Sequence, residues 1–309
     1  MGGSGSDFLS KTYSYEAIAR EIRETQAQTI NQQFEVEVSR IISSLLSQVN
    51  DRDIEAVNNH IDSIKDALNK DIEGTVNILF GGSVAKHTYV DGLSDIDALV
   101  LIDKTDFADK SPIEVKEYFF NRLQERFPRT SIKIGKLAVT VQFGDVEIQL
   151  LPSLKHESGY KIADSTGEKW SAIKPREFTT VLTNLNQSLS KKLVPTIKLA
   201  KSIISSLPKS QRLSGYHTES LAVEIFSKYH GQTRTKDMLK YFFSEAATKI
   251  LHPIQDRTGQ STHVDDYLDS ENSKRRQIIS RSLDRISRRM KNADGANSVE
   301  QWREILDPS

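Results

Sequence analysis

The spacing of apolar residues changes from a helical period to a strand period and back along this chain, and this change most constrains its fold. From Tyr13 to about Gln48, apolar residues recur three or four positions apart, and the segment DRDIEAVNNHIDSIKDALNK repeats that spacing. Strand-like runs follow in TVNILF, DIDALVLI, SIKIGKLAVTVQF and DVEIQLLPSL, with one helical segment, SPIEVKEYFFNRLQERF, among them. After Pro175 the strand signals stop and helical spacing returns. The pattern predicts an α+β unit followed by an α-helical lobe.

The same pattern suggests where the parts of the chain divide. Residues 1–12 include the run MGGSGS, and we expect them to be flexible or tag-like. Residues 13–174 form the mixed unit, which starts with one long helix that has at most one break. Residues 175–309 form the helical lobe, whose basic segment SKRRQIISRSLDRISRRMKN we interpret as a solvated helix face.

Composition excludes several classes of function. The 309 residues contain 42 basic and 42 acidic side chains, so no net positive charge favours strong binding of nucleic acid. There are no cysteines, which excludes disulfides and thiolate metal sites and is compatible with the reducing cytoplasm. No apolar run approaches the roughly 20 residues of a membrane span. We therefore expect a cytoplasmic protein without a membrane partner.

The stretch FGGSVAKHTYVDGLSDIDALVLID is the strongest candidate for a site. Gly81 and Gly82 follow a predicted strand, and the absence of side chains lets backbone N–H groups approach a ligand. Ser83 would lie near the start of a helix, an arrangement that suits a phosphate group. A Gly-Gly-Ser sequence by itself is better explained by an ordinary turn.

Two aspartates give that stretch its chemical meaning. Asp95 and Asp97 begin an apolar strand, and residues two apart on a strand point to the same face. Neighbouring carboxylates repel each other unless cations lie between them, and carboxylates are the ligands through which proteins hold magnesium beside substrate phosphates. An isolated Asp-x-Asp pair could cap a turn, but its position after a strand, a Gly-Gly-Ser and a helix-length spacer favours a catalytic site.

GGSVAKHTYVDGLSDIDALV resembles the active-site signature of the polymerase-β-like nucleotidyltransferases. The segments LVPTIKLAKSII, SGYHTESLAVEIFSKY and TGQSTHVDDYL narrow the resemblance to the bacterial CD-NTases, relatives of cyclic GMP-AMP synthase that act in anti-phage defence. The resemblance extends from about Tyr13 to Trp302. It implies a polymerase-β-like core with a mixed sheet and a long N-terminal spine helix, plus a helical lobe that binds nucleotide.

The resemblance also implies roles for the residues of the signature. Gly82 and Ser83 would hold the donor triphosphate, and Asp95 and Asp97 would bind two Mg²⁺ ions, with Mn²⁺ as an alternative. Lys86, His87 and Thr88 follow in the sequence and would line the rim of the pocket, although a structural role explains them equally well.

In the second half of the chain, the resemblance places a phosphate-binding lysine at Lys201, with Lys198 as the alternative one turn earlier. Tyr216 matches a tyrosine that stacks on the donor base, and Ser214 or the Gly215 backbone could reach the phosphates. Without the resemblance, the lysines could be exposed on an amphipathic helix, and the tyrosine could be a buried residue at a helix start.

The third carboxylate of the family is the point where this chain departs from the pattern. The family places an acid three positions before a proline, and the residue three before Pro152 is Gln149. Glu147 and Asp145 precede it at intervals of two, on the same predicted strand face. Glu147 could be the third ligand, Gln149 could occupy the site in a weakened enzyme, or the change could be natural variation. We favour Glu147, because it has the charge of a metal ligand and base.

The resemblance implies a template-independent nucleotidyltransferase that joins ribonucleoside triphosphates into a cyclic di- or trinucleotide and releases pyrophosphate. It also implies a downstream effector that senses the product and leaves open a regulatory protein partner. The alternatives are a nucleotidyltransferase that acts on RNA or a small molecule, and a weakened nucleotide-binding protein. The polar segment DRTGQSTHVDDYL, with His263, Asp265 and Asp266, is predicted to order the lobe interface rather than to bind a metal.

Overall fold

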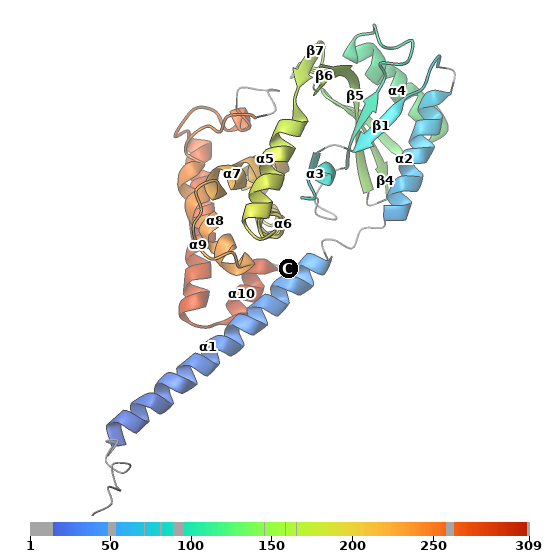
Figure 1. The fold of residues 1–309 in the computed structure, drawn as a ribbon. Coiled ribbons are helices and arrows are strands. Elements are labelled where there is room, and N and C mark those ends of the chain that lie inside the picture. Colours follow the sequence, from blue (N-terminus) through green and yellow to red (C-terminus); the bar gives the residue numbers. More distant parts are fainter. Residues whose placement is uncertain are drawn as a thin grey trace, which may run out of the picture.

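The computed structural model describes residues 15–48, 54–70, 72–80, 82–88, 96–144, 146–157, 159–164, 166–257 and 263–307. It has a mixed sheet with its own helices beside a bundle of helices. The second half of the long first helix lies along the bundle, and its first half projects away from it (Figure 1). The predicted α+β core, helical lobe and long N-terminal helix are therefore confirmed. The division into domains at residue 174 stays a prediction.

The helices and strands of the first part are, in chain order, α1 (Tyr15–Gln48), α2 (Ile54–Asn69), β1 (Asn77–Phe80), α3 (Gly82–Ala85), β2 (Ile96–Leu101), α4 (Pro112–Arg126), β3 (Ser131–Ile134), β4 (Val139–Phe143), β5 (Val146–His156), β6 (Gly159–Ala163) and β7 (Trp170–Ile173). The segment SIKIGKLAVTVQF divides into β3 and β4, because Gly135 turns the chain between them and its N–H bonds to the Ala138 carbonyl.

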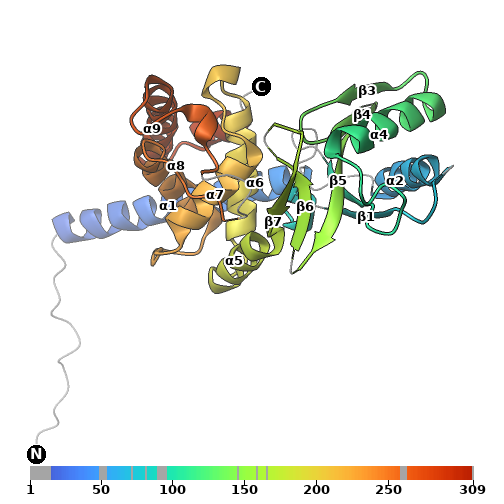
Figure 2. The same cartoon turned by 90° about the horizontal axis from the view of Figure 1, so that it is seen from above.

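The sheet has the order β1-β2-β5-β4-β3, and β6 and β7 extend it from the far end of β5. The pairing of β2 with β5 is parallel, whereas the other pairs are antiparallel. Alternate residues of β2, Ile96, Ala98 and Val100, point into a core shared with α2 and α4. Because side chains alternate along a strand, Asp97 lies on the opposite face of the sheet, which is turned toward the helical lobe (Figure 2).

Helix α4 illustrates how the sequence sets an element boundary. Ser111 caps its N-terminus by accepting the Glu114 N–H at 3.3 Å, and the Glu114 carboxylate accepts the Ser111 N–H at 2.9 Å. Pro112 then occupies the first turn, where a missing N–H costs nothing. The buried Val115, Phe119 and Leu123 follow at intervals of four and fix this helix on the sheet.

The helical lobe consists of α5 (Pro175–Ser188), α6 (Leu193–Ser205), α7 (Gly215–Phe226), α8 (Thr235–Lys249), α9 (Lys274–Gly295) and α10 (Val299–Leu306), with short 3₁₀ turns at Lys209–Gln211 and Asp266–Leu268. The sequence favoured one helical run across α5 and α6. The chain breaks there because Ser190 and Lys191 have φ angles of 52° and 60°, which an α-helix cannot contain.

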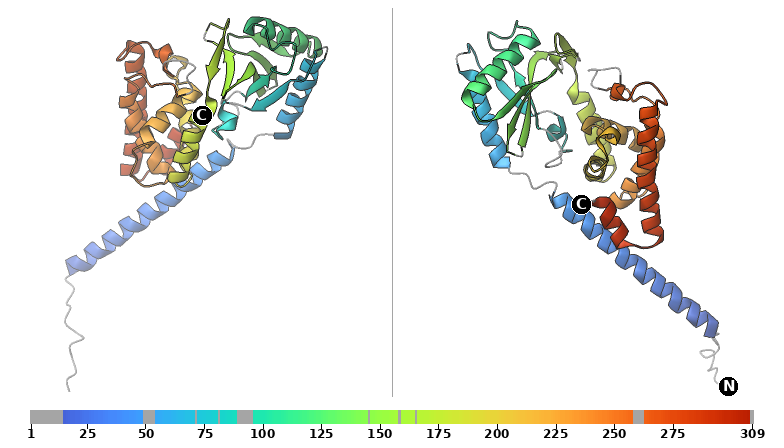
Figure 3. Two further views of the ribbon diagram at one scale, coloured as in Figure 1. Left: turned by 45° about the horizontal axis from the view of Figure 1, so that its top comes forward. Right: turned by 180° about the vertical axis from the view of Figure 1, so that it is seen from behind.

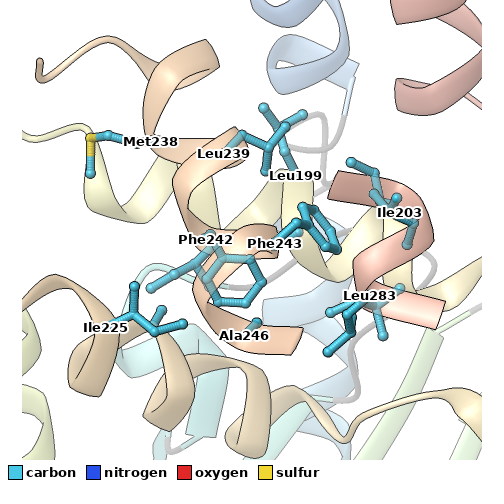
Figure 4. Close-up of a cluster of buried hydrophobic side chains, with 14 of the residues drawn as sticks. Leu199, Ile203, Ile225, Met238, Leu239, Phe242, Phe243, Ala246 and Leu283 are labelled. Atoms are coloured by element: carbon cyan, nitrogen blue, oxygen red, sulfur yellow. The ribbon is translucent and has the colours of Figure 1, made fainter. Parts of the chain in front are cut away.

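The core of the lobe is aliphatic and aromatic, and Figure 4 shows Phe242 and Phe243 of α8 among Leu199, Ile203 and Leu283 from neighbouring helices. Phe34, Val38 and Ile42 of α1 are buried in the same cluster, so the second half of α1 packs with the helical lobe (Figure 3). Among the described residues, none of the helices is both long and apolar enough to pass through a bilayer.

Candidate functional site

The glycine-serine segment joins the sheet to the helical lobe. Helix α3 begins at Gly82, two residues after the end of β1, and contacts both β2 and α7. Ser83 is buried, and its carbonyl accepts the Thr88 N–H at 2.9 Å, which closes the segment into a compact turn. Gly81 lies outside the described residues. The predicted sequence of strand, glycine and helix start is therefore present, and the phosphate-binding role of Gly82 and Ser83 stays a prediction.

Of the two predicted metal-binding aspartates, Asp97 is in the described part of the chain and Asp95 lies outside it. Asp97 is the second residue of β2. Burial raises the pKa of its carboxyl group, while the ammonium groups of Lys86 and Lys201 and a hydrogen bond from the Ser83 backbone act in the opposite direction. The carboxylate is thus held in a partly buried place where additional positive charge would stabilise it.

The neighbouring strand resolves part of the question about the third carboxylate. Gln149 lies directly opposite Asp97 in the parallel register of β2 and β5. Glu147 lies on the same face of β5, and Gln149 donates a hydrogen bond to its carboxylate (Nε2 to Oε1, 3.3 Å). Both side chains are partly buried. Asp145 lies outside the described residues. The Gln149 amide is therefore the side chain opposite Asp97, and the Glu147 carboxylate lies next to that amide. The assignment of Glu147 as the third ligand stays a prediction.

These side chains have the chemistry of a site for a hard divalent cation. Carboxylate and amide oxygens are the donors that magnesium takes, and the burial that raises the pKa of Asp97 would be offset by a cation beside it. Within the residues that the structure describes, no group of three histidine, cysteine, aspartate or glutamate side chains is close enough to hold a metal ion. The described donors, Asp97, Glu147 and Gln149, fit such an ion as part of a set that Asp95 would complete.

Lys201 of α6 reaches across from the helical lobe to the turn after α3. Its ammonium group lies 2.7 Å from Glu219 Oε1 and donates to the Thr88 carbonyl at 3.0 Å. Burial lowers the pKa of Lys201, and the Glu219 carboxylate counters that effect. Lys198, the alternative, is partly buried one turn earlier. The geometry thus brings Lys201 to the glycine-serine segment, as its predicted role requires.

The start of α7 lies beside the same lysine. Ser214 caps this helix, with its Oγ accepting the His217 N–H at 3.1 Å and its own N–H donating to the Tyr267 hydroxyl at 3.2 Å. Gly215 is exposed, and a Cβ atom built on it would lie 3.5 Å from the Lys201 ammonium nitrogen. The Ser214 hydroxyl accepts a hydrogen bond in the cap and keeps its own O–H as a donor, so the hydroxyl and the Gly215 backbone N–H both stay candidates to meet a phosphate.

Tyr216 lies in the first turn of α7 with its ring half-buried. Its hydroxyl donates to Asp256 Oδ1 at 2.8 Å, and its ring meets the edge of Phe178 at a centroid distance of 5.1 Å. The Lys86 ammonium lies 5.0 Å from the centroid of the Tyr216 ring, within range of a cation–π interaction. The predicted base-stacking role of Tyr216 is untested, but the structure places the ring next to the other candidate residues.

Glu219 is the site residue that sequence reasoning missed. Its side chain is only 1% exposed, and it forms ion pairs with Lys86 and Lys201 and accepts a hydrogen bond from Thr88 Oγ1. Burial acts to raise the pKa of Glu219, but the two ammonium groups outweigh it and hold the pKa below its usual value. The available signal was an acid within a segment, TESLAVEIF, that is otherwise apolar on most sides.

The polar segment 256–268 has a structural role in its described part. The Asp265 carboxylate accepts the Arg276 guanidinium at 2.6 Å and the Ile254 N–H at 3.1 Å. His263 lies 3.2 Å from Asp266, and both side chains are exposed. The prediction that this segment orders the lobe interface rather than binds a metal stays a prediction.

Comparison with known proteins shows which domain and which proteins this chain resembles. Residues 36–186 match the Second Messenger Oligonucleotide or Dinucleotide Synthetase domain, SMODS. The chain is 23% identical over 210 residues to the cyclic nucleotide synthase CdnE01 of Staphylococcus haemolyticus, a match that covers 54% of this chain and 70% of that protein.

Solved structures of similar fold agree with that match. CdnC of E. coli MS115-1, solved with ATP, has a TM-score of 0.67 at 16% identity, with coverage of 87% of this chain and 97% of CdnC. CdnC has also been solved in a complex with HORMA-deltaN, with a TM-score of 0.66 at 16% identity and coverage of 88% and 96%. The cyclic AMP-GMP synthase DncV of Vibrio cholerae, with a linear intermediate, has a TM-score of 0.61 at 11% identity and coverage of 96% and 89%. The chain therefore carries a match to the SMODS domain over residues 36–186, is similar to a cyclic nucleotide synthase, and shares its fold with CdnC and DncV.

Proposed function

We propose that this protein joins ribonucleoside triphosphates into a cyclic di- or trinucleotide and releases one pyrophosphate for each bond formed. One observation carries the proposal. Asp97 from the sheet, Lys86 from the turn after α3 and Lys201 from the helical lobe meet at the boundary between the two parts, where they interact electrostatically. A carboxylate for cations beside two ammonium groups for phosphates is the arrangement that nucleotidyl transfer needs.

Each part of this site has a distinct task. The backbone of Gly82 and Ser83, together with Lys201 and the Gly215 N–H, would hold the donor triphosphate. That hold would orient the α-phosphorus toward the attacking ribose hydroxyl, so that much of the rate gain comes from positioning. The ring of Tyr216 would stack on the base of the donor nucleotide.

Asp95, Asp97 and Glu147 are the residues that would hold two Mg²⁺ ions, which supply charge stabilisation for the attacking and the leaving oxygens. Glu147 would also accept the proton of the attacking hydroxyl. Its carboxylate is a base that lies beside Gln149 on the same face of β5. Gln149 would orient Glu147 through the hydrogen bond between their side chains.

The biological role belongs to the same proposal. The SMODS match and the synthase activities of the similar proteins support a cyclic product, which would act as a signal in anti-phage defence and be sensed by a downstream effector. The complex of CdnC with HORMA-deltaN supports a regulatory protein partner for this chain as well.

Gln149 gives a second candidate function its one supporting observation. A neutral amide lies opposite Asp97 in the register of β2 and β5, where a third acid would strengthen cation binding. A nucleotide-binding protein with weakened or no catalysis would have this feature.

The test incubates the purified protein with Mg²⁺ and α-labelled ribonucleoside triphosphates, singly and pooled, and separates phosphatase-resistant products. We expect a resistant product that is lost in Asp97→Ala. A labelled ladder extended from an added RNA primer would instead indicate RNA tailing. Triphosphate binding without pyrophosphate release would favour the second candidate.

A further inference from the structure

Glu219 stands at the meeting point of the two parts of the molecule. It belongs to α7 of the helical lobe, and it contacts Lys86 and Thr88, which follow α3 in the first part. Its third partner, Lys201, comes from α6. The carboxylate is 1% exposed and the two lysine side chains are 9% and 6% exposed, so water screens these charges little. One buried acid therefore fixes two ammonium groups from different parts of the chain.

The charges of this cluster do not balance within it. Two ammonium groups share one carboxylate, which leaves an excess of one positive charge. Asp97 is the other carboxylate that interacts electrostatically with Lys86 and Lys201. If Asp97 binds a cation, as the proposed function requires, it no longer offsets that excess, and the cluster becomes a site for an anion. A buried excess of charge needs a partner, and a phosphate chain supplies it.

Glu219 also fixes where that positive charge lies. It follows Gly215 by four residues in α7, which is one helical turn. The Lys201 ammonium that it holds is therefore kept close to the Gly215 backbone, at the N-terminus of α7, where helix N–H groups favour an anion. The Lys86 ammonium is held on the other carboxylate oxygen, near the Tyr216 ring. The two cations thus have defined positions on either side of the Glu219 carboxylate.

We propose that Glu219 is a positioning residue for the phosphates of the donor nucleotide, acting through Lys86 and Lys201. The inference rests on the proposed function, because it takes the donor site to be where these lysines meet. Glu219 itself does not touch the nucleotide. It sets the distance between the two ammonium groups, so that a triphosphate is bound more tightly than a nucleotide with fewer phosphates.

A purely structural role for Glu219 makes a different prediction. If the carboxylate only joined the two parts of the fold, its replacement would weaken binding of every nucleotide alike, since the whole pocket would loosen. If it positions the lysines, its replacement removes mainly the part of the affinity that comes from the outer phosphates. The ratio of the dissociation constants of AMP and ATP separates the two roles, because contacts with base and ribose cancel in it.

The experiment measures binding of ATP, ADP and AMP by calorimetry in Mg²⁺ for the wild-type protein, Glu219→Gln and Glu224→Gln. Glu224 lies on the same helix with an exposed side chain, which makes it a matched control. We expect the preference for ATP over AMP to fall by at least about tenfold in Glu219→Gln, because hydrogen bonds to charged groups are lost, and to stay unchanged in Glu224→Gln. An unchanged preference in folded Glu219→Gln overturns the inference.

Glu219→Asp keeps the experiment decisive if the glutamine variant does not fold, as thermal unfolding would reveal. Aspartate retains the charge but is one methylene shorter, so we expect it to hold one ammonium group well and the other poorly, with an intermediate preference for ATP. A wild-type preference in Glu219→Asp would count against the inference. If the wild-type protein bound no triphosphate, the proposed function would be overturned and this inference with it. If the wild-type protein bound ATP and the Glu219 variants kept the same preference for ATP over AMP, the inference alone would be overturned.

Discussion

Two of the buried ionic clusters in the described part of the chain differ in the number of unmatched charges. In the first, Arg276 is 0% exposed and its guanidinium donates to Asp265 and to the carbonyls of Ile250 and Ser270 at 2.6, 3.0 and 3.1 Å. One cation meets one carboxylate, and oxygen atoms receive its remaining donors. This Arg276 cluster is complete in itself, as a structural cluster has to be.

In the second, the Glu219 cluster, two ammonium groups share one carboxylate beside the partly buried Asp97. The same kinds of side chain are used, and burial is similar, but the arrangement leaves positive charge for a ligand to match once Asp97 binds a cation. The comparison teaches that the balance of charge, rather than burial, separates a cluster that supports the fold from one that serves a site.

The largest expected effect comes from disrupting the Arg276 cluster. Arg276→Met should lower the free energy of unfolding by about 3–5 kcal/mol, because it leaves the Asp265 carboxylate buried without its partner. Chemical denaturation of Arg276→Met and of the exposed control Arg281→Met measures the difference. A loss below about 1 kcal/mol would mean that the cluster is not the closed network described here.

Replacement of Asp97, which lies beside the Glu219 cluster, should lower the catalytic rate without lowering the stability of the fold. Asp97→Asn should lower the rate of nucleotidyl transfer by more than about 100-fold, since even outer-shell changes at metal sites cost 10–100-fold. The fold should not be weakened without metal, because burial already disfavours the charged form of Asp97. Initial rates and thermal unfolding of Asp97→Asn, with exposed Asp109→Asn as control, test both statements. If Asp97→Asn were destabilised but still active, Asp97 would serve the fold rather than the site.

The Arg276 cluster should also be sensitive to pH through His217, which lies 3.7 Å from Asp265. Burial lowers the pKa of His217 from 6.5 to about 4, with Asp265 opposing and Arg276 reinforcing the shift. The unfolded chain then takes up a proton before the folded one as the pH falls below 6.5, so stability is lost toward pH 4.

From pH 7 to pH 5 this loss amounts to about 2 kcal/mol. His217→Gln should remove that part of the pH dependence, and exposed His230→Gln should not. Urea unfolding at a series of pH values provides the measurement. Parallel profiles for His217→Gln and the wild-type protein would show that His217 is protonated in the folded state as readily as in the unfolded state.

The smallest effect is expected from the removal of Gln149 on β5. Glu147→Gln should lower the turnover rate by about 100-fold, the lower end for removal of a general base, because Gln149 remains to contribute an oxygen. Gln149→Ala should cost less, since it removes only a neutral partner of Glu147. Single-turnover rates of the two variants compare them directly, and the opposite order would assign the third position to Gln149.

Periodicity was enough to predict the main elements of the fold, because burial of one face leaves a clear spacing in α4, α8 and β2. It did not predict β6, β7 or α10, which are short and mix polar with apolar residues. The division of one predicted helix into α5 and α6 depends on the positive φ angles of Ser190 and Lys191. Serine and lysine do not predict such angles from the sequence.

The candidate site was predictable where a motif carries it and unpredictable where partners come from distant segments. Lys201 was selected through a family resemblance, and the structure brings it to the turn after α3. Glu219 could not be assigned from the sequence, since 131 residues separate it from Thr88 and only the fold brings the two together. The register that places Gln149 opposite Asp97 likewise needed the structure.

The burial of Phe34, Val38 and Ile42 among residues of the helical lobe has a consequence for synthesis on the ribosome. The apolar cluster between α2 and β5 draws on residues 57–150 and can close as soon as that stretch has emerged. The apolar stripe of α1 is made earlier but packs against α8 and α10, which are made last. During translation, this stripe stays without its packing partners while the sheet folds, so it is an exposed apolar surface on which a chaperone can bind.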